Sequence, residues 1–284
     1  MIIFNKPRAI HSFLKNKRSA KNRTGFVPTM GALHPGHISL IEAAKKENDE
    51  VISSIFVNPT QFNDPEDFKK YPITPEKDIL SLEIAGCDVL FLPSVSDIYP
   101  AGINNLSHYD LGFLETILEG KYRPGHFQGV CQVVHRLLEI VLPNNLYLGQ
   151  KDYQQCLVIQ KLIRLIGFGD KIRVSICPTL REDDGLAMSS RNTRLNEEER
   201  KKANAIFKTL LFIKSNLYAM KVEQLKKAAL SSLTEKGFKV DYVEVADATT
   251  LQLVDAWDGK QKIIALAAAF LGNVRLIDNM VLNP

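Results

Sequence analysis

The chain has 284 residues, of which 24% are charged, and its formal net charge is +4. This length allows one large or two modest domains, and the weak positive charge does not argue for nucleic acid as a partner. No segment approaches transmembrane length, and the N-terminus lacks the apolar stretch of a signal peptide, so we expect a cytoplasmic protein with no membrane partner. The scattered cysteines have neither metal nor redox spacing and are expected to be reduced packing residues, namely Cys87, Cys131, Cys156 and Cys177.

The first part of the chain alternates short apolar runs with longer helical patterns. This alternation predicts an α/β fold with a Rossmann-like, doubly wound parallel sheet. The basic run 15–23 is interpreted as a solvated helix end. The expected strands are 25–27, 51–57, 88–92, 145–148 and 172–177. One expected helix begins at 37, and the others cover 75–85, 128–141 and 156–166.

The pattern changes after residue 188. We expect one long helix from 196 to 218, a second over 222–236, and strands at 241–245, 262–267 and 273–277. These elements predict a smaller C-terminal α+β domain, in which the apolar run 263–270 forms core or interface. With the boundary near Pro178, the domains are 1–177 and 178–284, and the second carries the loop 188–191.

Two histidines, His34 and His37, lie where the first predicted strand passes into a helix N-terminus. Free backbone N–H groups and the helix dipole favour an anion there. Added imidazoles suit a triphosphate, because they follow the charge that builds on the phosphoryl oxygens as pyrophosphate leaves. Surface or capping histidines and a zinc-binding pair are the alternatives, although no adjacent glutamate or nearby cysteine or carboxylate cluster completes a zinc site.

A second polar loop, Met188-Ser189-Ser190-Arg191, follows the strand predicted at 172–177. The planar arginine fork suits phosphate oxygens, and the hydroxyls suit β- and γ-phosphates. Taken alone, such a loop is more often a helix cap than a ligand site. Its occurrence together with the histidine turn favours nucleotide binding.

Further polar residues follow two other predicted strands. Asn58 and Gln61 come after 51–57, and their amides suit a carboxylate or a hydroxyl, although Asn58-Pro59 is also a common turn initiator. After 145–148, Gly149 permits close backbone approach, Lys151 offers a charge for phosphate, and Asp152 suits a helix cap or a ribose. Open α/β sheets bind ligands at such carboxyl ends.

Together these motifs resemble the pantothenate synthetase family, the AMP-forming pantoate–β-alanine ligases of the HxGH nucleotidyltransferase superfamily. The resemblance covers nearly the whole chain in family order. Two positions depart from the family pattern, since Leu148 replaces an aromatic residue and Gln150 replaces a carboxylate. The matching segments are 28–37, 56–62, 71–72, 123–130, 149–155, 184–192 and 275–279.

The resemblance implies that ATP, accompanied by Mg²⁺, activates pantoate as an adenylate that β-alanine then attacks, and that the enzyme is a homodimer. Residues 1–177 would then bind ATP and pantoate, and residues 178–284 would close over the active site. It implies catalytic roles for His37 as proton donor and for His34, Lys151 and Arg191. Pantoate would be bound by Met30, Asn58, Gln61 and Gln155, and β-alanine by Gln61. The implied ATP-binding residues are Met30, Gly31, Ala32, Leu33, His34, Pro35, Gly36, His37, Gly149, Gln150, Lys151, Asp152, Leu180, Met188, Ser189, Ser190 and Arg191.

The sequence also leaves other functions open. An aminoacyl-tRNA-synthetase relative or another HxGH nucleotidyltransferase would share the histidine turn, but no basic anticodon-binding extension follows. A non-catalytic ligand-binding descendant is hinted at only by Gln150. The sequence does not support an enzyme that forms an acyl phosphate and releases ADP, because the chain lacks a Gly-x-x-x-x-Gly-Lys-Ser/Thr loop.

Overall fold

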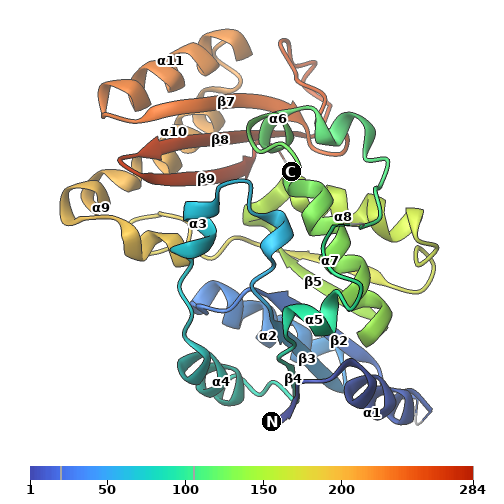
Figure 1. Ribbon diagram of the computed structural model, residues 1–284. Helices are drawn as coiled ribbons and strands as arrows, with labels where there is room; N and C mark the ends of the chain where they lie inside the picture. Colours follow the sequence, from blue (N-terminus) through green and yellow to red (C-terminus); the bar gives the residue numbers. More distant parts are fainter. Residues whose placement is uncertain (20, 105, 284) are drawn as a thin grey trace. The chain divides into compact units, whose positions relative to one another are not determined.

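The computed structural model describes residues 1–19, 21–104 and 106–283 (Figure 1). The described chain packs as two compact units. The N-terminal unit consists of residues 1–149 and 155–178, and the C-terminal unit consists of 150–154 and 179–284. The short segment 150–154 therefore packs with residues that follow it by more than a hundred positions in the sequence.

The N-terminal unit contains a six-stranded parallel sheet with the order β1-β4-β3-β2-β5-β6, which confirms the predicted doubly wound fold. From the central strand β2, the chain adds β3 and β4 on one side and β5 and β6 on the other. The connections after β2 and β5 therefore diverge, which creates the crevice where such sheets bind ligands. The strands are β1 (Ile2–Phe4), β2 (Thr24–Thr29), β3 (Glu50–Ile55), β4 (Val89–Phe91), β5 (Asn145–Gly149) and β6 (Arg173–Cys177).

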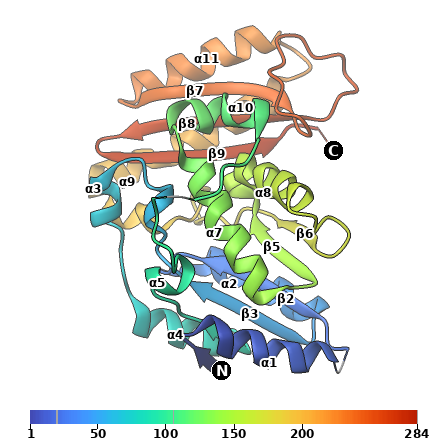
Figure 2. The same ribbon diagram turned by 45° about the vertical axis from the view of Figure 1, so that its right-hand side comes forward.

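Helices cover both faces of this sheet because alternate strand residues point to opposite faces. Phe26 and Ile52 are buried in a core with α1, α7 and α8, whereas Val27 and Val51 are buried in another core with α2 and α4. Figure 2 shows α1 beside α7. The helices are α1 (Pro7–Ser19), α2 (Pro35–Glu47), α3 (Pro65–Lys69), α4 (Pro75–Ile84), α5 (Val95–Ile98), α6 (Leu118–Tyr122), α7 (His126–Val141) and α8 (Tyr153–Leu165).

The C-terminal unit contains a three-stranded antiparallel sheet with the order β7-β8-β9. Its central strand buries residues 263–269 within the chain, so this apolar run forms core. The elements are α9 (Glu197–Ala203), α10 (Ala205–Asn216), α11 (Val222–Glu235), β7 (Lys239–Asp247), β8 (Ile263–Leu271) and β9 (Val274–Val281).

The expectation of one long helix from 196 to 218 is wrong. The helical pattern is interrupted at Asn204, between α9 and α10. Asparagine is a weak helix former because its side chain competes for nearby backbone groups. The flanking Ala203 and Ala205 are both buried, so the small side chains allow the chain to turn against the core.

Several short elements escaped the sequence analysis, including β1 and the helices α3, α5 and α6. Within the described residues, no helix is both long enough and apolar enough to cross a membrane.

Candidate active site

The histidine motif forms the junction between β2 and α2. His34 is the N-cap of α2, with extended backbone angles, and Pro35 occupies the first helical position, where its missing N–H costs no hydrogen bond. The His34 N–H donates to His37 Nδ1 at 3.3 Å, and the two rings lie 4.0 Å apart between centroids. Because Nδ1 accepts this bond, a neutral His37 carries its proton on Nε2, which is then the donor.

The turn before these histidines is held by a buried carboxylate from α4. Asp78 is 1% exposed, and its oxygens accept hydrogen bonds from the Ala32 and Leu33 N–H groups, both at 2.8 Å. The Thr74 hydroxyl donates to the same carboxylate at 3.1 Å. Gly31 and Ala32 have φ angles of 81° and 49°, a left-handed conformation that is unfavourable for alanine. Asp78 therefore stabilises a strained turn at the entry to the histidine motif.

Gln61 lies in a short 3-10 helix (Pro59–Gln61) directly after β3 and is held by two side chains. Asn58 Nδ2 donates to Gln61 Oε1 at 3.1 Å, and Gln61 Nε2 donates to the sulfur of Met30 at 3.0 Å. Asn58 is 1% exposed and also accepts a 2.8 Å hydrogen bond from the Tyr99 hydroxyl. The amide of Asn58 is therefore a buried support that orients Gln61.

The Arg-Pro-Gly-His motif supports the same turn from α7. His126 Nδ1 donates to the Gln61 carbonyl at 2.8 Å, while its Nε2 accepts from Arg123 at 3.1 Å. An arginine is always a donor, so this pair of contacts fixes the neutral tautomer of His126. Gly129 allows the close approach, because a Cβ atom there would lie 2.2 Å from the Thr60 carbonyl oxygen.

The last predicted site residues of the N-terminal unit lie at the end of β5 and at the start of α8. Gly149 ends the strand, and a Cβ atom built on it would meet nothing within 4 Å, so the space above it is open. Gln155 is half-buried in the first turn of α8. Because β3, β2 and β5 are adjacent and parallel, the predicted residues of this unit gather at the carboxyl ends of three neighbouring strands.

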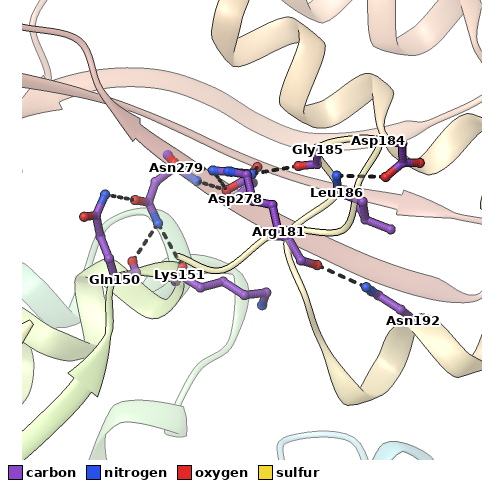
Figure 3. Close-up of polar contacts among 10 residues, drawn as sticks. Gln150, Lys151, Arg181, Asp184, Gly185, Leu186, Asn192, Asp278 and Asn279 are labelled. Carbon is purple, nitrogen blue, oxygen red and sulfur yellow. Dashed lines mark hydrogen bonds and ion pairs between the residues drawn. The ribbon is translucent and has the colours of Figure 1, made fainter. Parts of the chain in front are cut away.

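The C-terminal unit holds Gln150, Lys151 and Asp152 in a single 3-10 turn. Asn279 on β9 donates to the backbone carbonyls of Gln150 and Lys151, both at 2.9 Å (Figure 3). The Lys151 side chain points away from Asn279 in this view, and no carboxylate of the described residues forms an ion pair with it. Its ammonium group is therefore available to an anion.

The loop that leads to Met188 is a tight hairpin. The Met188 N–H donates to the carbonyl of Leu180 at 3.1 Å, and Arg181 pairs with Ala187 in an antiparallel bridge. Ser189 caps a 3-10 helix (Ser190–Arg194) by accepting from the Arg191 N–H at 3.2 Å. This contact is the helix cap that the sequence offered as the alternative to a ligand site in this loop. The Ser189 O–H can still donate a hydrogen bond.

Sequence reasoning missed three supports of these turns, because each lies far along the chain from the turn that it holds. These residues are Asp78, His126 and Asn279. The segments containing His126 and Asn279 were noted as motifs without a role, and Asp78 gave no separate signal.

The four cysteines form no disulfide and lie in or beside the cores. Burial raises the pKa of both Cys87 and Cys131 to about 12, so neither thiol is a nucleophile near neutral pH. Within residues 1–19, 21–104 and 106–283, no three histidine, cysteine or acidic side chains gather as a metal-binding cluster.

Comparison with known proteins identifies the family. The family model described as pantoate-beta-alanine ligase matches residues 2–281. Pantothenate synthetases from Cytophaga hutchinsonii and Porphyromonas gingivalis are 44% and 42% identical to this chain, each over 99% of both proteins.

Solved structures agree with this result. The crystal structure of pantothenate synthetase from Thermus thermophilus has a TM-score of 0.92 and 38% identity over 100% of both chains. The pantoate-beta-alanine ligase of Francisella tularensis, solved with beta-gamma ATP and beta-alanine, has a TM-score of 0.82 and 42% identity over 99% of this chain and 97% of its own. These matches confirm the resemblance found in the sequence: the chain belongs to the pantoate-beta-alanine ligase family and is a ligase.

Proposed function

We propose that this chain joins pantoate to β-alanine in two steps at the residues described above. In the first step, a pantoate carboxylate oxygen attacks the α-phosphorus of ATP, the bond to the bridging oxygen breaks, and pyrophosphate leaves. In the second, the β-alanine amine attacks the acyl carbon of pantoyl adenylate, AMP leaves, and the amine loses a proton. The protein must align two anions and stabilise the charge that moves toward pyrophosphate.

The observation that carries this proposal is the histidine pair at the N-terminus of α2. The dipole of α2 favours phosphate oxygens there. We assign the role of proton donor to His37, because its Nδ1 accepts the His34 N–H and the hydrogen of a neutral ring is then on Nε2. Met30 to Leu33 and the ring of His34 line the same nucleotide, and Asp78 holds the turn that presents them.

Pantoate binds through Gln61 and Gln155, with Met30 and Asn58 beside them. Within the described part of the chain, Gln61 Nε2 donates to the sulfur of Met30 at 3.0 Å, and because sulfur is a weak acceptor, a ligand oxygen is the better partner. Asn58 contributes by fixing the opposite end of the Gln61 amide. Gln61 also binds β-alanine once the adenylate has formed.

The remaining ATP contacts come from Gly149 to Asp152, Leu180 and Met188 to Arg191. Lys151 and Arg191 supply charge for the phosphates, and the two serines supply hydroxyl donors. Mg²⁺ would accompany ATP as part of the substrate and would offset the negative charge of its phosphates.

We further propose that the enzyme is a cytoplasmic homodimer. This proposal rests on the family resemblance alone. Light scattering of the purified protein at several concentrations measures the mass directly, and a monomer throughout would contradict it.

The proposal is tested by exchange of labelled pyrophosphate into ATP without β-alanine. Exchange that requires pantoate is expected, whereas release of ADP would indicate acyl-phosphate chemistry instead. Replacing His37 by alanine should lower the exchange rate at least about 100-fold with little change in the KM for pantoate, because a lost transition-state interaction lowers kcat. The exposed His108 is the matched control, since His108→Ala should leave the rate unchanged.

A further inference from the structure

Two polar residues, Asp278 and Asn279, are buried on β9. Each is 2% exposed, although the strand packs on an apolar core. Buried polar groups are costly unless their hydrogen bonds are satisfied. Both belong to a sequence motif to which the reaction itself assigns no role, so their contacts indicate what they do.

Asn279 uses its whole amide to hold one turn. Its Nδ2 group donates to the carbonyls of Gln150 and Lys151, both at 2.9 Å, and its Oδ1 accepts from Gln150 Nε2 at 3.2 Å (Figure 3). Because both amide hydrogens go to backbone carbonyls, the remaining oxygen can only accept. The backbone at Lys151 is therefore fixed from β9.

Asp278 holds the neighbouring hairpin in the same way. Its carboxylate receives both terminal nitrogens of Arg181, at 2.6 and 3.0 Å, and the Arg181 guanidinium lies over the Phe207 ring at 4.4 Å. Arg181 also donates to the Gly185 carbonyl at 3.0 Å. Adjacent residues of one strand thus fix both the lysine turn and the hairpin that leads to the loop 188–191.

We propose that Asn279 is a positioning residue that sets the Lys151 ammonium on the ATP phosphates. The inference rests on the proposed function, which places Lys151 on phosphate. The departure from the family pattern at position 150 does not affect it, because Asn279 holds the turn through two backbone carbonyls, and the Gln150 side chain adds one further hydrogen bond.

A double-mutant cycle in the pantoate-dependent exchange assay tests this inference. Asn279→Ala should lower kcat/KM for ATP by about 10- to 100-fold, as misplacement of a reacting group does. Lys151→Ala should lower it at least as much. In the double variant the losses should not multiply, because Asn279 acts through Lys151. Multiplied losses, or an Asn279→Ala variant within about twofold of the wild type, would overturn the inference.

Asn283 provides a matched structural control. It is also a buried asparagine of the C-terminal unit, and it accepts from the Ile263 N–H and donates to the Gln261 carbonyl, both at 2.8 Å. Asn283→Ala should lower the thermal midpoint comparably to Asn279→Ala while leaving kcat/KM for ATP within about twofold. An equal kinetic loss in both variants would show that Asn279 only stabilises the fold.

A wild-type enzyme that shows no pantoate-dependent exchange would refute the proposed function. An active wild type with an unaffected Asn279→Ala variant would refute the positioning role alone, so the two failures are distinguishable.

Discussion

Replacing Asp78 by asparagine removes a charge from the most completely buried carboxylate beside the histidine motif. At present one oxygen accepts from Ala32 N–H at 2.8 Å, and the other accepts from Leu33 N–H at 2.8 Å and from the Thr74 hydroxyl at 3.1 Å. An asparagine keeps only one acceptor, so its NH₂ group must face a backbone N–H. Leaving that buried backbone N–H without an acceptor costs about 1–3 kcal/mol, and the remaining two hydrogen bonds are no longer made to a charged carboxylate. We expect a loss of about 2–4 kcal/mol in the free energy of unfolding.

The same substitution should impair catalysis without touching a ligand. The φ angle of 49° at Ala32 is strained, so the turn relaxes when the hydrogen bonds to residue 78 weaken. A shift of about 1 Å in the groups that bind ATP costs on the order of 100-fold in rate. We expect kcat/KM for ATP to fall about 10- to 100-fold, which pyrophosphate exchange measures, while urea unfolding measures the stability.

Glu76 supplies the control, because it lies in the same first turn of α4, carries the same charge and is exposed. Glu76→Gln should change stability by less than about 0.5 kcal/mol and leave the kinetics intact. The reasoning is refuted if Asp78→Asn is as stable as Glu76→Gln, or if it loses stability but keeps wild-type kcat/KM for ATP at a temperature where it is folded.

Two further substitutions test the packing around the site. Gly129→Ala puts a Cβ atom 2.2 Å from the Thr60 carbonyl oxygen, so α7 and the turn that carries Gln61 must separate. We expect about 1–3 kcal/mol of destabilisation and a raised KM for pantoate. An unchanged free energy of unfolding together with an unchanged KM would contradict the close approach. Burial raises the pKa of Cys131 from 9.0 to about 12, so the unfolded chain loses this proton first and stability falls as the pH rises above 9. Between pH 8 and 10 the wild type should lose about 1.4 kcal/mol more than Cys131→Ala, and equal losses would show that the thiol is not buried.

The sheet could be predicted from the sequence because its central strands are strongly apolar and separated by turns and helices. The residues that follow β2, β3 and β5 were found for the same reason, since parallel strands bring their carboxyl ends to one edge. β1 escaped because it has three residues, of which Ile2 and Ile3 are exposed, so it carries no burial pattern. The break at Asn204 escaped because one asparagine changes the helical pattern too little to be seen.

The residues that support the site could not be predicted, and the reason is the same for each. Asp78 is 46 positions from Ala32, His126 is 65 from Gln61, and Asn279 is 128 from Lys151. A pattern in sequence reports local periodicity, whereas these contacts depend on how distant elements pack.

These three supports share a physical logic that follows from the chemistry. An enzyme that must bring a triphosphate and a carboxylate together works against their repulsion, so its donors must be in place before the ligands arrive. In each case a buried polar side chain, Asp78, His126 or Asn279, fixes the backbone of a turn and leaves that turn's own side chains for the ligand. Satisfied buried networks of this kind rigidify a site. The supports are therefore expected to govern turnover as strongly as some residues that touch the substrate.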